Sequence, residues 1–378
     1  MLTKKPYAST IKYNLKYLNK LASFYLSNKN QDKAILIYDK ILKIDPNDTN
    51  ALMSLADYYK NKGNEEKYKY YAQKAFSNKN INVDTKITIL YSYIQESEKD
   101  SSKLDEAFEY VKILVKAHPK DAKGWAIYGD LFNIDEQQEK ALEKYKKSLT
   151  LRQDIFSVWQ QVFFIESDLK KYDDLINSTE EAKELFPNQT LVYFFNGLAY
   201  SQQKEYQKSN AAYEKGVKKA VNNPKLKAQF YSNLGENYND LKEYEKSDEN
   251  FEKSLEIEPD NQYVLNNYAY YLSLREEKLE RAKEMSVLSL ELSPDNPTYL
   301  DTYAWILYKN KEYKEAYKNQ EKAIHLSEKP SAALYDHLGD MLYRMNKIDE
   351  AVNYWKKAKE QGDDSEELMK KINERKIN

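Results

Sequence analysis

Histidine and carboxylate side chains are the groups of this chain that could carry acid–base or metal chemistry. The three histidines are His118, His325 and His337, and no two of them share a helix at the spacing of a zinc site. His118 and His325 fall late in expected helices, where a surface position near the helix end explains them. The chain has 61 Asp and Glu residues, so many that none stands out as a general acid or base. We therefore predict no catalytic residue, no metal site and no cofactor.

Other motifs that would indicate an enzyme or a nucleic-acid-binding protein are missing as well. The eight glycines form neither a dinucleotide-binding motif nor a P-loop, and the chain has no nucleophile elbow. Cysteine is absent, which excludes disulfides and thiolate metal sites. Lysines and acids are interspersed and the net charge is −2, whereas nucleic acid would require a concentrated basic stripe. The sequence thus predicts a protein that is not an enzyme and does not bind nucleic acid.

The chain also lacks the sequence signals of a membrane protein. A membrane span needs about 18 consecutive apolar residues, and no such run occurs. The first residues, MLTKKPYASTIKYNLKY, lack the apolar core of a signal peptide. We expect a soluble protein, cytoplasmic if the chain is complete and periplasmic or exported if an N-terminal signal has been trimmed.

The elements that position any binding residue are indicated by a repeated spacing of small residues. Gly235, Ala269, Ala304 and Gly339 are separated by 34, 35 and 35 residues. Twelve residues after the first small residue comes a second one, and four residues later an aromatic residue, as in the series Gly235, Ser247, Phe251 and Gly339, Ala351, Trp355. Residues four apart lie on one face of a helix, so the pattern predicts pairs of antiparallel helices that approach closely at the small residues.

This pattern resembles the tetratricopeptide repeat, most clearly in SNLGENYNDLKEYEKSDENFEKSLEIEPDN and DHLGDMLYRMNKIDEAVNYWKKA. The resemblance implies an all-α fold, a right-handed α–α superhelical solenoid of helical hairpins. Ten units are expected to begin near Leu15, Thr49, Val83, Ala122, Phe156, Thr190, Ala228, Gln262, Pro297 and Ala332. The last four units are also similar to the C-terminal part of long bacterial repeat proteins, through NNYAYYL and YLDTYAWILYKNKEYKEA.

We expect the repeats to form one continuous array over residues 15–363. Residues 1–14 lead into the first helix, and residues 364–378 form a capping helix that begins after Ser365, a favourable N-cap residue. The fifth unit departs from the pattern, with Phe163 and Leu175 where small residues are usual. These large side chains predict a local distortion or a wider helix spacing there.

In the family, the first helix of each unit lines a concave surface, and residues phased from the first small residue face the ligand. The resemblance therefore implies a protein- or peptide-binding groove lined by Gln160, Phe164, Phe194, Phe195, Leu198, Asn233, Glu236, Asn266, Asn267, Tyr270, Asp301, Trp305, Tyr308, Asp336, Asp340 and Tyr343. Two interpretations of its apolar members remain open, because they could contact a ligand or be buried by the curvature of the array.

The polar part of this groove indicates the chemistry of a partner. Its Asp and Glu side chains would favour a basic partner segment, Trp305 and Tyr270 could stack on arginine, and an aromatic segment is the alternative partner. The leading functional hypothesis is a non-catalytic scaffold or adaptor that binds a protein or peptide segment. The alternative is a structural or self-associating assembly factor of the bacterial cell envelope, which would form a homo-oligomer.

Overall fold

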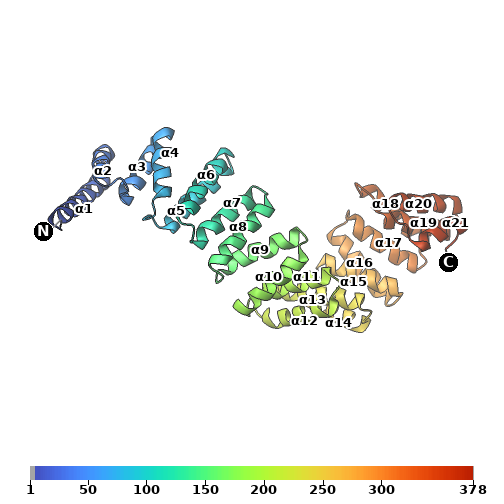
Figure 1. Cartoon of the computed structure of the whole chain (residues 1–378). Coiled ribbons are helices and arrows are strands. Elements are labelled where there is room, and N and C mark those ends of the chain that lie inside the picture. The colour runs from blue at the N-terminus through green and yellow to red at the C-terminus, as the bar shows by residue number, and fades with distance from the viewer. Residues whose placement is uncertain (1–4, 378) are drawn as a thin grey trace. The chain divides into compact units, whose positions relative to one another are not determined.

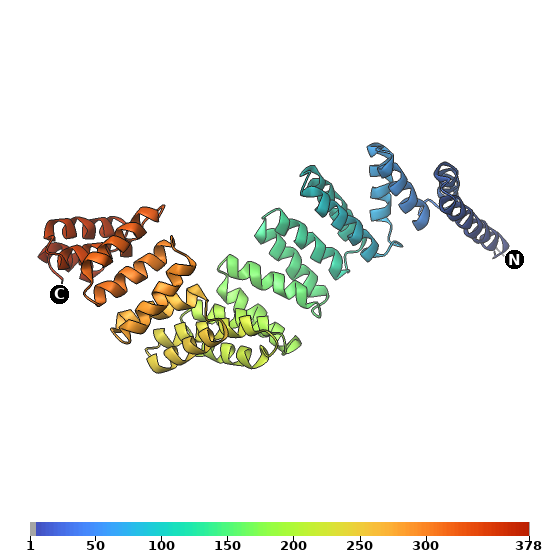
Figure 2. The ribbon, with the colours of Figure 1, turned by 180° about the vertical axis from the view of Figure 1, so that it is seen from behind.

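The computed structural model describes residues 5–377, with side chains from residue 14 onward, and this part of the chain contains helices and no strand. Figure 1 shows the ribbon, and Figure 2 shows it from behind. The contacts divide the chain into two compact units, residues 1–187 and residues 188–378. No helix of the described part is long and apolar enough to cross a membrane.

The first unit is built from five helical hairpins, each a first helix followed by an antiparallel second helix. These hairpins are α1 (Lys5–Ser27) with α2 (Gln31–Ile44), α3 (Thr49–Asn61) with α4 (Glu65–Ser77), α5 (Val83–Ser97) with α6 (Ser102–Ala117), α7 (Ala122–Ile134) with α8 (Gln138–Leu151), and α9 (Phe156–Asp168) with α10 (Tyr172–Leu185).

The second unit has five hairpins and one further helix. They are α11 (Thr190–Gln202) with α12 (Tyr206–Lys219), α13 (Pro224–Asp240) with α14 (Tyr244–Ile257), α15 (Gln262–Arg275) with α16 (Leu279–Leu292), α17 (Pro297–Lys309) with α18 (Tyr313–Leu326), α19 (Ala332–Arg344) with α20 (Ile348–Glu360), and the last helix α21 (Glu366–Glu374). The predicted all-α repeat fold is confirmed. Eight of the ten first helices begin at the residue expected from the sequence, and α1 and α13 begin earlier.

The first small residue of a hairpin lies directly against the aromatic ring of the second helix. A Cβ atom added to Gly197 would lie 2.3 Å from the ring of Tyr213, and one added to Gly339 would lie 2.4 Å from the ring of Trp355. Contacts this short do not occur between real atoms, so the ring could not keep its position beside a larger residue. This geometry confirms the close approach that the repeated spacing predicts.

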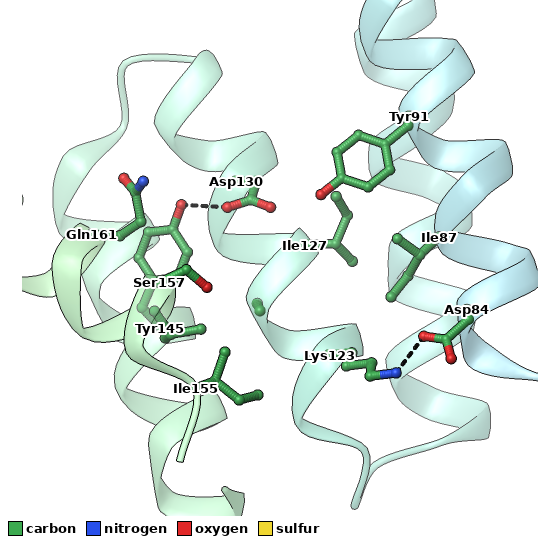
Figure 3. A pocket seen from close by; sticks show the side chains of 12 residues that line it. Asp84, Ile87, Tyr91, Lys123, Ile127, Asp130, Tyr145, Ile155, Ser157 and Gln161 are labelled. Carbon is green, nitrogen blue, oxygen red and sulfur yellow. Dashed lines mark hydrogen bonds and ion pairs between the residues drawn. The ribbon is translucent and has the colours of Figure 1, made fainter. Parts of the chain in front are cut away.

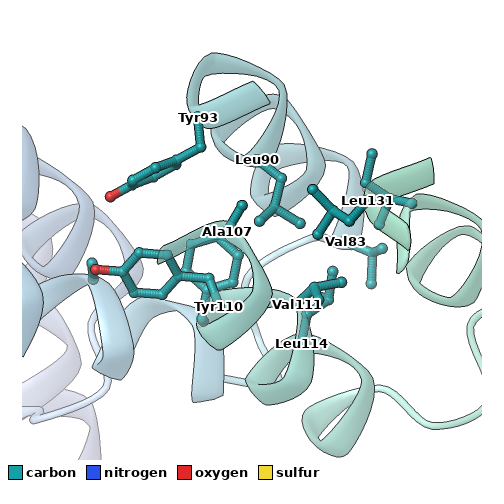
Figure 4. Packing of buried hydrophobic residues seen from close by; sticks show 11 residues of the cluster. Val83, Leu90, Tyr93, Ala107, Tyr110, Val111, Leu114 and Leu131 are labelled. Atoms are coloured by element: carbon teal, nitrogen blue, oxygen red, sulfur yellow. The ribbon is translucent and has the colours of Figure 1, made fainter. Parts of the chain in front are cut away.

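A core cluster of the first unit joins neighbouring hairpins, as Figure 4 shows for α5, α6 and α7. Leu90 and Tyr93 of α5 pack with Tyr110 and Leu114 of α6 and with Leu131 of α7, and all five are buried. Full burial of such a side chain stabilises the fold by about 1.5–3 kcal/mol. Each hairpin therefore depends on its neighbour to cover its apolar side.

Phe163 and Leu175, the two large residues of the fifth hairpin, are both fully buried. The ring of Phe163 lies 6.2 Å from that of Trp159, one turn earlier on α9. In this hairpin, bulky side chains thus occupy the positions at which small residues bring the two helices close together in other hairpins.

A buried lysine was not foreseen from the sequence. Lys86 of α5 donates hydrogen bonds from Nζ to the carbonyl oxygens of Phe76 (2.8 Å) and Asn78 (2.7 Å) at the end of α4. Its Nζ also lies 2.8 Å from Nε2 of His118. Burial lowers the pKa of Lys86 to about 8, and burial together with the Lys86 charge lowers the pKa of His118. The expectation that His118 is a plain surface residue is corrected, because it is half-buried and pairs with Lys86.

The turn between the two helices of a hairpin has the same backbone conformation in most units. One residue there has a left-handed conformation, with φ between +55° and +66°. Glycine occupies this position at Gly63, whereas the other hairpins have Lys29, Glu136, Lys170, Lys204, Lys242, Glu276, Lys311 and Asn346. A side chain in this conformation costs about 1 kcal/mol relative to glycine.

The last helix covers the end of the second unit. Ser365 is its N-cap, and its Oγ accepts a hydrogen bond from the backbone N–H of Leu368 (3.3 Å), as expected from the sequence. Leu368 is buried in a cluster with Leu338 and Trp355. The final hairpin is thereby shielded from solvent on its outer apolar side.

Candidate functional site

The first unit has a hollow of about 340 Å³ that runs along three successive first helices, α5, α7 and α9 (Figure 3). We call it the α7 hollow. Its lining includes Asp84, Ile87 and Tyr91 from α5, Lys123, Ile127 and Asp130 from α7, and Ser157 and Gln161 from α9. The hollow therefore lies on the face that the family resemblance assigns to binding.

Asp130 is the central polar group of the α7 hollow. Figure 3 shows it flanked by Tyr145 on one side and Tyr91 on the other. The Tyr145 hydroxyl donates a hydrogen bond to Oδ1 of Asp130 at 2.7 Å. The hydroxyl reaches Asp130 because the Tyr145 ring lies against Gly129, where an added Cβ would be 2.7 Å away. Burial raises the pKa of Asp130, although the Tyr145 hydrogen bond acts in the opposite direction.

An ion pair lies at one end of the same hollow. Nζ of Lys123 is 2.6 Å from Oδ1 of Asp84, and both side chains are well exposed. Tyr91, also exposed, presents its ring to the hollow, and burial and the nearby Asp130 charge raise the pKa of its hydroxyl. Among the described residues, no group of three or more His, Asp or Glu side chains is arranged to hold a metal ion.

The second unit has a hollow of about 740 Å³ along α11, α13 and α15. We call it the α13 hollow. Its lining is mostly polar and includes Asn223, Gln229, Ser232, Asn233, Asn261 and Tyr263. Asn223 and Asn261 are N-caps of their own helices, bonded to Leu226 and Val264. Ser232 is buried, and its Oγ has no hydrogen-bond partner within the described part of the chain.

The acidic groups predicted at the end of the second unit are paired inside the protein. Nζ of Lys371 on α21 lies 2.9 Å from carboxylate oxygens of both Asp336 and Asp340. Nε1 of Trp355 also donates to Asp340 at 2.9 Å. Burial and the Asp336 charge raise the pKa of Asp340 to about 6, although Lys371 opposes this. The expectation that Asp340 faces an open groove is corrected, because it is buried and anchors the capping helix.

Asp301 is also satisfied within the fold. It accepts hydrogen bonds from Nε2 of Gln320 (2.7 Å) and lies 2.8 Å from Nδ1 of His337. Burial alone would lower the pKa of His337, but the charge and hydrogen bond of Asp301 outweigh it and hold the pKa above its ordinary value. The same pairing holds the pKa of Asp301 below its ordinary value, against the effect of burial. A basic ligand would have to compete with these partners.

The predicted aromatic anchors of this region are likewise occupied. The Trp305 ring stacks on His337 with centroids 4.1 Å apart and on Tyr308 at 4.9 Å. Tyr308 is buried, which corrects its placement in the open groove, and its hydroxyl accepts a hydrogen bond from Nε of Arg344 (3.3 Å). Tyr343 is half-buried with its ring tilted against that of Trp355. Trp305 itself is half-buried, so these rings leave only part of it accessible to a partner's arginine.

The predicted asparagines and Glu236 divide between open and closed positions. Asn233 lines the α13 hollow. Glu236 accepts hydrogen bonds from the hydroxyl of Tyr263 (2.8 Å) and from Nδ2 of Asn267 (3.1 Å). Asn266 is buried, so its expected groove position is corrected, and Tyr270 is half-buried beside Tyr271. Of this group, Asn233 is the residue whose side chain lines a hollow.

The predicted apolar residues also differ among themselves. Phe164 in the first unit is 47% exposed, whereas Phe195 in the second is buried, which corrects its expected position in the groove. Phe194 is half-buried with its ring 5.9 Å from that of Phe230, and Leu198 is half-buried. Gln160 is half-buried, but the residue beside it, Gln161, is the one that lines the α7 hollow. Packing on the next hairpin accounts for Phe194, whose ring also lies 5.4 Å from that of Phe195.

Sequence reasoning missed Asp130, Tyr91 and Tyr263 as lining residues. Asp130 directly follows the small residue Gly129, so the phasing that indicated Glu236 and Asp340 would have found it in the fourth unit. Tyr91 and Tyr263 lie at other positions of the first helix, and the repeat spacing gives no signal for them.

Comparison with known proteins agrees with the repeat architecture. Models of the tetratricopeptide repeat match residues 15–48, 228–261 and 331–360. The Homo sapiens protein O-mannosyl-transferase TMTC3 is 24% identical over 296 residues, which cover 73% of this chain. The chain spans only 31% of the length of that human protein.

A solved structure shows the same fold. A crystal structure of a tetratricopeptide repeat protein from Parabacteroides merdae has a TM-score of 0.54 at 16% identity and covers 67% of this chain and 98% of that one. Yeast Tom70 aligns over 98% of this chain and 92% of its own, with 16% identity and a TM-score of 0.44. The repeated small residues, the hairpins that they hold together and the matched segments make this chain a tetratricopeptide repeat protein.

Proposed function

We propose that the protein is an interaction scaffold that binds a segment of another protein along the first-helix face of its hairpins. The observation that carries this proposal is the position of the two hollows, each of which crosses three successive first helices. A segment lying in either hollow would contact three hairpins at once. Because packed helices form the walls, little conformational entropy would be lost by the protein on binding.

The α13 hollow has the chemistry to hold an extended peptide backbone. The side-chain amides of Gln229 and Asn233 each offer donors and an acceptor, which matches the alternating N–H and C=O groups of a peptide. The Oγ of Ser232 is shielded from solvent, so the two amides are the groups that a ligand can reach.

Selection of peptides from a random display library on the full chain tests this proposal. Ser157→Trp fills the α7 hollow and Gln229→Trp fills the α13 hollow, while Gln207→Trp places the same side chain on the exposed surface of α12. The selected peptides should bind the filled variants about tenfold or more weakly, since several contacts are lost together. The Gln207 variant should bind as the wild type does. Equal binding by all variants would place the interaction elsewhere.

Self-association is the second candidate function, and one feature of α16 favours it. Val287, Leu288 and Leu292 on this second helix are 37%, 38% and 45% exposed. Exposed apolar side chains that lie together on one helix can form an interface. Sedimentation velocity over a range of concentrations separates the two functions. A dimer that Leu288→Glu disrupts and Gln229→Trp leaves intact would support self-association.

A further inference from the structure

We propose that the α7 hollow receives an arginine side chain of the partner segment, with Asp130 as its counter-ion. This inference rests on the proposed binding function and names the side-chain chemistry of one of its two sites. The hollow combines a half-buried carboxylate, an aliphatic wall and an exposed aromatic ring, which are the three surroundings that a long cationic side chain uses.

The charge of the hollow is negative after internal pairing. Three charged side chains line it, and two of them, Asp84 and Lys123, neutralise each other at 2.6 Å. The remaining charge belongs to Asp130, whose hydrogen-bond donor within the described residues is the neutral hydroxyl of Tyr145. This contact uses Oδ1, which leaves Oδ2 for a ligand. Asp130 is thus a poorly hydrated carboxylate with no cation beside it.

Two acids at comparable positions of the second unit have a basic partner, and a third has two hydrogen-bond donors instead of one. Asp340 lies beside Lys371, and Asp301 lies beside His337. Glu236 accepts two hydrogen bonds from side chains of its own unit. Asp130 is therefore the first-helix acid that is both in a hollow and without a second partner in the described structure.

The remaining walls suit the stem and the planar head of arginine. Ile87, Ile127 and Ile155 form an aliphatic lining against which the methylene groups could lie. Tyr91 presents its ring across from Asp130, as Figure 3 shows, where it could stack on a guanidinium group. Gln161 supplies an amide oxygen for the donors that Asp130 does not use. A lysine ammonium would lack the stacking and the additional donors.

Methyl NMR on the full chain, labelled at the isoleucine δ1 positions, tests the inference directly. The probes are two capped heptapeptides, one with a central arginine among alanines and one with neutral citrulline at the same place. We expect the arginine peptide to shift the methyl signals of Ile87, Ile127 and Ile155 in a saturable way. Citrulline keeps the shape but removes the charge, so its peptide should bind about ten- to a hundredfold more weakly.

Two variants with the same change of charge provide the control. Asp130→Asn keeps an oxygen for the Tyr145 hydroxyl and should weaken the arginine peptide by about tenfold or more. Asp105→Asn, at an exposed position on the second helix α6, should leave its affinity unchanged. Thermal unfolding checks that Asp130→Asn remains folded, and the citrulline comparison needs no variant at all.

Three results would overturn the inference: no saturable shift, equal affinity for the two peptides, or full binding by Asp130→Asn. The proposed function fails separately. If peptides selected from the library still distinguish the filled variants but show no preference for arginine, the scaffold function stands and the role of Asp130 is rejected.

Discussion

Replacement of Lys371 by methionine should loosen the capping helix α21. Lys371 is buried, and its ammonium group lies 2.9 Å from both Asp336 and Asp340. Methionine keeps the length and the apolar contacts of the stem while removing the charge. Loss of one partner of a buried ion pair costs about 3–5 kcal/mol, because the other charge stays buried.

The structure indicates a smaller loss than this general value. The pKa of Asp340 is already about 6, one unit below neutral pH. One unit corresponds to about 1 kcal/mol, so Asp340 can take up a proton at modest cost once Lys371 is gone. Asp336 is partly exposed, so solvent reduces the free-energy cost of leaving its charge unpaired. We expect the free energy of unfolding to fall by about 2–3 kcal/mol at pH 7.

The pH dependence of this loss has a definite sign. Asp340 has a raised pKa in the folded protein, so the folded state binds its proton more tightly than the unfolded state. Lys371 lowers this pKa in the wild type, so its removal raises the pKa further, and the cost of the unpaired charge is present at high pH and disappears as the pH falls toward 6. The difference between Lys371→Met and the wild type should shrink between pH 7 and pH 5.

Urea unfolding and hydrogen exchange of α19–α21 measure this prediction. Lys370→Met is the matched control, because Lys370 is exposed on the same helix. Exchange should accelerate in α19–α21 for Lys371→Met and stay at the wild-type rate for Lys370→Met. An equal cost for the two variants, or a loss that grows as the pH falls, would refute the reasoning.

Three further predictions concern other features of the fold. Gly197→Ala should lower the free energy of unfolding by about 1–3 kcal/mol through overpacking, whereas Gly124→Ala, with its nearest contact at 3.6 Å, should be neutral or stabilising in the same urea assay. Lys204→Gly should stabilise the protein by about 0.5–1 kcal/mol, because φ is +60° there; a loss of stability in thermal unfolding would contradict this. Asp301→Asn should lower the pKa of His337, since it removes the charge that opposes burial most strongly and leaves only the weaker effects of Asp336 and Asp340, and NMR titration of the imidazole measures it. With Asp301 present, the His337 pair stabilises the fold fully below the ordinary histidine pKa and loses this effect as the pH rises through the raised value.

The helices were predictable because the repeat determines both their ends and their buried faces. The close contact of Gly235 with Phe251, for example, follows from a spacing that is visible in the sequence. The left-handed turns were not predictable, because Lys204 and Lys242 stand where glycine would have signalled them. Only Gly63 gave that signal, and a single instance does not reveal a repeated turn.

The candidate site was only partly predictable, for a different reason. Phasing from the small residues gives the direction of a side chain but not its partners. Asp340 is paired with Lys371, which lies 31 residues later on a helix outside the hairpins. Such a pairing depends on tertiary packing, so phasing alone suggested an open acidic groove. Asp130 follows the same phasing and remains without a cation, because no helix in the described structure brings a basic side chain to it.

Serine hydroxyls on second helices reach carbonyl groups of the first helix in the same hairpin. Ser148 donates to the carbonyl of Ala122 at 2.8 Å, and Ser254 donates to that of Ala228 at 2.9 Å, each across 26 residues. These bonds fix the relative axial position of the two helices, and they involve no residue of a neighbouring hairpin. A gene segment encoding one hairpin could thus be duplicated or moved with its internal alignment intact, and only the apolar seams to its new neighbours would need to adapt.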